Sequence, residues 1–272
     1  MMKKTVWIAL LLSGGIFWSF AQVQSFNEVG SIDWDKRTLS AHGIGVPNPT
    51  MPPITARPMA IQAARSVALR NAYNLVEKVQ ITSSTNAGQE MKRDETIRSS
   101  VRNYINSFKE STPRYTLNKS VEITLEIPLD RQLGDLLYPK EVTEAPRISK
   151  VAAQRNRSTP STGVVIDARG LNITPALAPR IFDESGRELY GPAFSSRKFA
   201  IQWGLVGYST DLAAAEQSVE RVGDSPTTLK ALRSTGLTKT DIVISSEDAR
   251  LFETVVQSPH ILSEGHLIFV ID

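Results

Sequence analysis

The sequence predicts an α+β protein of two small domains, each a mainly antiparallel or mixed sheet covered by helices. Residues 121–127 alternate apolar and polar, as a strand with one buried face does. Residues 57–79 repeat apolar side chains every three or four positions, which indicates a long helix. Continuous apolar runs at 164–166 and 267–271 are typical of central strands buried on both faces. We therefore expect domains at 26–138 and 163–272.

The first residues have the pattern of a secretory signal peptide. Lys3 and Lys4 precede an apolar stretch from Val6 to Phe20, and Ser19-Phe20-Ala21 has the small-x-small form of a cleavage site. We expect residues 1–21 to be removed after Ala21, and the protein to be exported to the periplasm or the periphery of the outer membrane. The absence of cysteine excludes disulfides, thiol catalysis and a lipid anchor on cysteine.

The charge balance argues against a nucleic-acid partner. Removal of the leader takes two lysines from the 31 basic residues, and 28 acidic residues remain to balance the rest. Strong binding to nucleic acid needs clustered phosphate contacts. We expect none.

In the first domain, "SIDW" and "TLSAHG" flank the polar turn Asp35–Arg37 and predict a hairpin. The helix that follows presents a stripe made mostly of alanine, which would let it lie close to a sheet. A second helix is indicated by apolar spacing from Ile97 to Phe108. The strand "SVEITLEIPL" should bury Ile123, expose Glu122 and offer an edge to an added strand.

The two domains are separated by residues 139–162, which are polar, punctuated by proline and locally basic. A solvated linker is the simplest interpretation. The alternative is a weak electrostatic contact between its basic side chains and an anionic lipid or envelope polymer.

The second domain opens with "GVVIDARG", in which Asp167 should end a strand and Gly170 supply a turn. "RIFDESGRELYG" predicts a hairpin that turns at 184–186. "DIVISSEDARLFETVV" predicts a strand that leads into a helix capped by Ser245 and Asp248 as a capping box. We single out Asp167, Arg169, Gly170 and Asn172 as a candidate interaction turn, since loops carry function.

No complete catalytic, cofactor or metal motif is present. The strand "VVID", which ends in Asp167, is similar to the opening strand of a zinc amidase. No histidine adjoins Asp167, however, and His260 and His266 alone do not make a zinc site. Ser195–Lys198 matches a serine-x-x-lysine pattern without its companion motifs, and no glycine-x-serine-x-glycine sequence occurs. "HGIG", His42–Gly45, lacks the third glycine of a phosphate-binding loop. We predict no catalytic residues and no cofactor.

With "LSAHGIGVPNP" and "AIQAARSVALRNAYNLVEKV", the first domain resembles the LPP-twenty lipoprotein family and the N-terminal module of flagellar assembly protein T. The resemblance implies a small α+β domain that supports or decorates an envelope assembly, without catalytic residues. The chain departs from the lipoprotein pattern because it lacks the anchoring cysteine. Through "GVVIDARGL", "PRIFDESGRELYG" and "DIVISSEDARL", the second domain resembles the C-terminal part of uncharacterised bacterial exported proteins.

We therefore expect a noncatalytic exported envelope protein that binds or supports a protein assembly, flagellar or associated with the outer membrane. The alternative is a cell-wall hydrolase or glycan-binding protein with an unfamiliar site near Asp167, which would contact peptidoglycan. A third interpretation is peripheral contact with a membrane through the basic linker.

Overall fold

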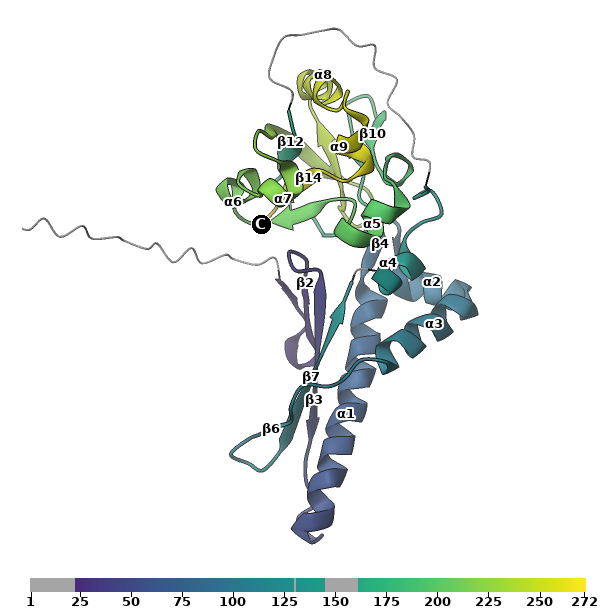
Figure 1. Ribbon diagram of the computed structural model, residues 1–272, viewed down its shortest axis with the longest axis vertical. Coiled ribbons are helices and arrows are strands. Elements are labelled where there is room, and N and C mark those ends of the chain that lie inside the picture. Colours follow the sequence, from purple (N-terminus) through teal and green to yellow (C-terminus); the bar gives the residue numbers. More distant parts are fainter. Residues whose placement is uncertain (1–22, 130, 145–160) are drawn as a thin grey trace, which may run out of the picture.

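The computed structural model describes residues 23–129, 131–144 and 161–272, and has the predicted α+β architecture. The predicted signal peptide and residues 145–160 of the predicted linker lie outside the described residues. We call residues 23–144 the N-terminal module and residues 161–272 the C-terminal module. Figure 1 shows the N-terminal module as a tall sheet beside one long helix, with the C-terminal module above it.

The N-terminal module is an antiparallel sheet with helices on one side. Its strands run in the order β1-β2-β3-β7-β6. The elements are β1 (Val23–Ser25), η1 (Asn27–Val29), β2 (Gly30–Asp33), β3 (Thr38–Gly45), α1 (Pro53–Lys78), β4 (Gln80–Thr82), β5 (Thr85–Asn86), α2 (Ala87–Arg93), α3 (Glu95–Asn106), β6 (Arg114–Tyr115), β7 (Val121–Pro128) and α4 (Arg131–Leu137). The predicted hairpin, long helix and half-buried strand are confirmed.

The alanine stripe of α1 packs directly against glycines of β3. Ala60, Ala64 and Ala68 are buried, and a Cβ atom placed on Gly43 would lie 2.0 Å from the Ala64 carbonyl oxygen. One on Gly45 would lie 1.9 Å from the Ala60 carbonyl oxygen. Small residues on both elements therefore bring the helix and sheet backbones close together, and "HGIG" is a packing motif.

The position of β7 differs from the prediction of an exposed edge. β7 lies between β3 and β6, and Arg114 and Tyr115 of β6 pair with its first two residues. Further along, the Thr124 backbone exchanges hydrogen bonds with Ser111 at 2.9 and 3.0 Å. The chain before β7 folds back along the strand, which the alternation of β7 alone could not indicate.

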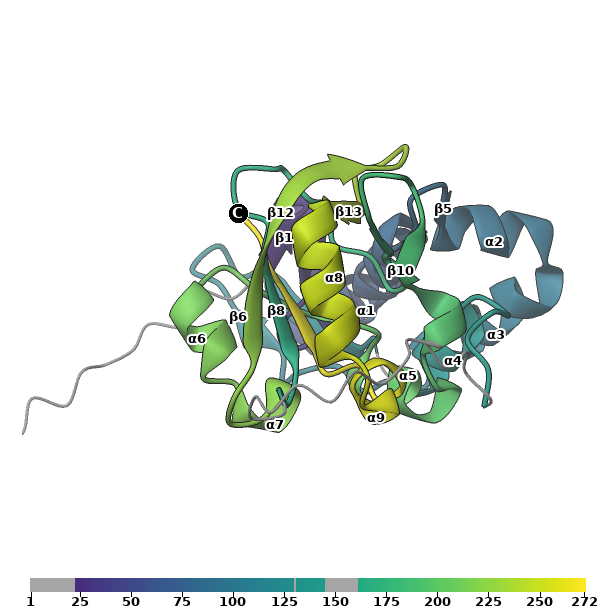
Figure 2. The same cartoon turned by 90° about the horizontal axis from the view of Figure 1, so that it is seen from above.

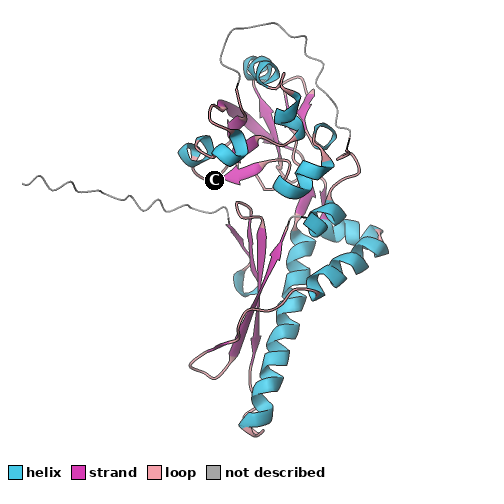
Figure 3. Ribbon diagram, viewed as in Figure 1, coloured by secondary structure: helices cyan, strands magenta, loops and turns pink. Residues whose placement is uncertain are grey.

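The C-terminal module has a mixed sheet in the order β10-β9-β13-β12-β8-β14-β11. Strands β12, β8, β14 and β11 are parallel to one another, and β13 is antiparallel to β12. The elements are β8 (Val164–Asp167), β9 (Ile181–Phe182), β10 (Glu188–Tyr190), η2 (Pro192–Phe194), α5 (Arg197–Trp203), β11 (Gly207–Ser209), α6 (Leu212–Glu216), α7 (Val219–Val222), β12 (Thr227–Thr235), β13 (Asp241–Ile244), α8 (Ser246–Val255), α9 (Pro259–Ser263) and β14 (Leu267–Val270). Helix α8 lies across this sheet in Figure 2, and Figure 3 separates the helices from the strands.

The secondary-structure predictions for this module are confirmed with one difference. The two apolar runs are the adjacent buried strands β8 and β14, and β9 and β10 form the predicted hairpin. Ser245 caps α8 by accepting a hydrogen bond from the Asp248 backbone nitrogen at 2.9 Å. The Asp248 carboxylate, however, accepts from the Ser245 hydroxyl and does not complete the predicted capping box. The Asp248 side chain is bonded to the Ser245 hydroxyl, whereas a capping box would need it to bond to the Ser245 backbone nitrogen.

The two modules are joined by backbone hydrogen bonds as well as side chains. The nitrogens of Leu177 and Ala178 donate to the carbonyls of Gln80 and Ile81 at 2.9 and 2.8 Å. Arg197 pairs with Asp135 at 2.8 Å. A single buried apolar cluster runs through both modules. Within the described ranges, no helix is both long enough and apolar enough to cross a membrane.

Candidate functional site

The parallel strands of the C-terminal module end together at the edge that faces the N-terminal module. The register places Asp167 of β8 opposite Val270 of β14, and Val270 opposite Ser209 of β11. In α/β sheets, ligands bind outside the carboxyl ends of parallel strands. This edge is therefore the first place to look for a site.

The four residues of the predicted interaction turn lie together at this edge. Asp167 ends β8, and both of its oxygens accept hydrogen bonds from the Arg169 guanidinium, at 2.8 and 2.7 Å. The Asp272 carboxylate accepts from the Gly170 and Asn172 nitrogens at 2.7 and 3.3 Å. Gly170 and Asn172 have φ values of +82° and +52°, which fit a tight turn.

The electrostatics of the turn argue against an acid role for Asp167. The hydrogen bonds from Arg169 lower the pKa of Asp167 below its ordinary value. A general acid in hydrolysis needs a raised pKa, so that it holds a proton at neutral pH. Asp167 is an ionised carboxylate paired with its neighbour, which fits a structural role in the turn.

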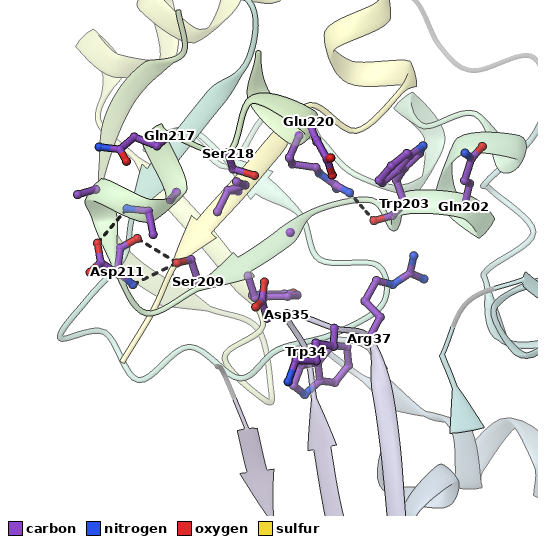
Figure 4. A pocket seen from close by; sticks show the side chains of 18 residues that line it. Trp34, Asp35, Arg37, Gln202, Trp203, Ser209, Asp211, Gln217, Ser218 and Glu220 are labelled. Atoms are coloured by element: carbon purple, nitrogen blue, oxygen red, sulfur yellow. Dashed lines mark hydrogen bonds between the residues drawn. The ribbon is translucent and has the colours of Figure 1, made fainter. Parts of the chain in front are cut away.

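A cleft of about 700 Å³ opens beside this edge, between the two modules. Its lower wall is the turn between β2 and β3, residues 34–37, and its upper wall is formed by α5, β11, α6 and α7 (Figure 4). Buried Trp34 packs edge-on against Tyr208, with ring centroids 5.7 Å apart. The Tyr208 hydroxyl exchanges hydrogen bonds with the Ala176 backbone at 2.9 Å in both directions. These contacts fix the floor of the cleft.

Two arginines line the cleft, and their guanidinium groups differ in how completely they are hydrogen-bonded. The Arg221 guanidinium donates to the carbonyls of Trp203, Gly204 and Leu267, and burial lowers its pKa to about 10. Nη2 of Arg37 donates to Leu129 O and to the Tyr138 hydroxyl, both at 3.2 Å.

Nη1 of Arg37 is buried without a hydrogen-bond partner among the described residues. An unpaired buried donor is costly. Because this atom is buried, the folded protein bears that cost, and the polar groups that a ligand can reach lie on the rim of the cleft.

The rim of the cleft is rich in carboxylates. Asp35, Asp211 and Glu220 are exposed there, whereas the basic side chains are engaged: Lys36 pairs with Asp33 at 3.4 Å. Partial burial and the nearby Asp33 carboxylate raise the pKa of Asp35. A cationic group placed beside Asp35 would relieve that repulsion.

The other residues considered from sequence lie elsewhere. His260 and His266 stack edge to face at 6.0 Å beside α7, and His266 Nδ1 lies 2.7 Å from Arg221 O. Ser195 is buried and bonded to the Tyr190 hydroxyl at 2.7 Å. His42 lies on the open face of the N-terminal sheet, with its ring 3.1 Å from the Thr124 hydroxyl. The described residues contain no group of three or more metal-ligating side chains that could hold a metal ion.

Sequence reasoning missed the cleft because its walls are distant in the chain. Trp34 and Arg37 were visible only as parts of the predicted hairpin, and the sequence offered no prediction for Trp203 or Arg221. A large aromatic residue at the turn, next to three charged residues, was the available signal.

Comparison with known proteins concerns the C-terminal module. Residues 163–272 match a family model described as the second domain of Treponema pallidum Tp0624, a bacterial domain family. No curated protein matches the chain. The family match therefore covers the whole upper wall of the cleft, and the lower wall comes from the N-terminal module.

Proposed function

We propose that this protein is a noncatalytic exported envelope protein that binds a partner protein through the cleft between its modules and supports an assembly. The observation that carries the proposal is the cleft itself, at the carboxyl ends of the parallel strands. The resemblance of the first domain to the LPP-twenty family and to flagellar assembly protein T supports an envelope role, in a flagellar or outer-membrane assembly. The predicted signal peptide supports export.

The chemistry of the cleft favours a basic polypeptide segment. The exposed carboxylates of Asp35, Asp211 and Glu220 can meet lysine or arginine side chains of the segment. Trp203 adds an exposed aromatic surface at the rim. An acidic or purely apolar partner would leave these groups unsatisfied.

The test is site-specific photocrosslinking in cells. A photoreactive amino acid at Gln217, on the rim, should capture a partner, whereas the same group at Arg250, exposed on α8, should not. The crosslink at Gln217 should be lost in an Asp35→Lys, Glu220→Lys variant. Equal capture at both positions, or none at Gln217, would contradict the proposal.

A second candidate is glycan binding. Trp203 is 41% exposed at the rim, beside the amide of Gln202, and sugar rings pack on exposed indole faces while amides bind their hydroxyls. The purified protein should then sediment with peptidoglycan, and Trp203→Ala should weaken this. Release of soluble fragments that disappears in Asp167→Asn would instead indicate a hydrolase.

A further inference from the structure

The end of the N-terminal module that lies farthest from the C-terminal module has an unusual surface. We call residues 43–64 and 112–121 the tip; they comprise the end of β3, the loop after it, the start of α1 and the β6–β7 hairpin. Figure 1 shows these segments together at the lower end of the molecule. Tyr115 of the hairpin lines a shallow groove with Ile54 and Arg57 of α1, so the hairpin and the start of the helix lie side by side.

The tip concentrates exposed apolar side chains. Of the thirteen large hydrophobic residues that are exposed among the described residues, seven lie here: Ile44, Val46, Met51, Ile54, Met59, Tyr115 and Leu117. Leu117 is 104% exposed and Ile54 is 83% exposed. Gathered apolar exposure of this kind marks a surface that binds a protein or a membrane.

The charge of the tip distinguishes between these partners. Its two segments contain Arg57, Arg114 and Lys119 and no acidic residue. Arg114 pairs with Glu122, whereas Arg57 and Lys119 form no ion pair with another described residue. An anionic surface therefore complements the tip.

The shape points to lipid. The most exposed apolar side chains project from separate segments, Val46 from the loop after β3, Ile54 from α1 and Leu117 from the hairpin. A protein partner would need a concave surface complementary to all three side chains, whereas the fluid interface of a bilayer can rearrange around a projecting end. Arginine and lysine can keep their charges at the headgroups while their stems lie among apolar groups, and tyrosine is favoured at that depth.

We propose that the tip inserts into the interface of an anionic lipid membrane, with Ile54 and Leu117 as its main apolar anchors and Arg57 and Lys119 at the phosphates. This contact is separate from the cleft and from the basic linker considered in the sequence. It would place the protein at a membrane surface while the cleft remains open.

The test is flotation of the purified protein with vesicles of phosphatidylglycerol and phosphatidylethanolamine, compared with vesicles of phosphatidylcholine. The protein should float with the anionic vesicles. Ile54→Ser and Leu117→Ser should each lower the partition constant by about tenfold. Arg57→Gln and Lys119→Gln should each lower it by about fivefold, on the anionic vesicles only.

Leu237→Ser provides the matched control, because Leu237 is 85% exposed in the C-terminal module and should not affect flotation. A Leu117→Trp variant should show a blue shift of its fluorescence on anionic vesicles. Absence of flotation, or an equal loss in Leu237→Ser, would overturn the proposal. So would a dimer in solution that Leu117→Ser abolishes, since the tip would then bind a second copy. All these outcomes are independent of crosslinking at the cleft.

Discussion

Gly43→Ala tests the close contact of α1 with the sheet. The backbone of Gly43 is outside the left-handed region, so alanine meets no conformational strain there. By intrinsic preference alone, replacing glycine by alanine in a strand should stabilise the fold by about 0.5–1 kcal/mol. The structure predicts the opposite, because the added methyl group would lie 2.0 Å from the Ala64 carbonyl oxygen and 2.4 Å from the Ala68 nitrogen.

The magnitude follows from this geometry. The obstructing atoms belong to the helix backbone and cannot rotate away, so α1 must retreat by about 1.4 Å to restore an ordinary contact of 3.4 Å. That retreat loosens the buried alanines along the helix. Overpacking costs typically about 1–3 kcal/mol, and we expect about 3 kcal/mol here because the helix is long. Such a loss should lower Tm by roughly 6–12 °C if the protein unfolds in one transition.

Urea unfolding followed by circular dichroism measures the change. His42→Ala is the matched control, since His42 is the preceding residue on the same strand but is exposed on the open face, and its substitution should cost less than about 1 kcal/mol. If Gly43→Ala unfolds at the same urea concentration as the wild type, the close packing of glycine against alanine is refuted.

Four further outcomes are expected. Ile123→Asp should unfold the N-terminal module, because it puts an unpaired charge into the core, whereas Glu122→Lys should leave a folded protein; circular dichroism of both variants checks the strand register. Hydrogen bonds from Ser185 and Arg187 lower the pKa of Asp183 to about 2, so its stabilisation should be complete above its ordinary pKa of 3.8 and be lost as the pH falls to about 2; Asp183→Asn should flatten the dependence of Tm on pH in that window. Arg221→Met should cost about 3 kcal/mol or more in urea unfolding, since three carbonyls lose their donor. Asp167→Asn should change stability by no more than about 1 kcal/mol, because its pair with Arg169 is partly exposed; a large loss would mean that the turn holds the strand edge.

Local patterns predicted most of the elements because each depends on side chains close in sequence. The alternation around Ile123, the alanine spacing of α1 and the cap at Ser245 all act within a few residues. The capping box of α2, in which Asn86 and Gln89 bond to each other's backbone nitrogens, was equally local and could have been read.

The candidate site could not be predicted in the same way. Its floor needs Trp34 to meet Tyr208, and the turn needs Asp272 to bind Gly170, contacts that span more than 100 residues. No local pattern encodes such pairings, because they depend on which strands lie side by side. The sequence identified Asp167 as the end of a strand. Its pairing with Arg169, which keeps the carboxylate ionised, became visible only in the geometry of the folded turn.

The long helix separates the two proposed binding surfaces. Helix α1 has 26 residues, which corresponds to roughly 40 Å at the rise of an α-helix. It begins at Pro53 in the tip, and the Gln80 and Ile81 carbonyls in the strand that follows it accept hydrogen bonds from the C-terminal module. A lipid surface at the tip and a protein in the cleft therefore would not compete for the same residues. The helix is held against β3 by close packing of glycine on alanine. Gly43→Ala should therefore make the position of the tip relative to the cleft less well defined, even where each surface still binds its own partner.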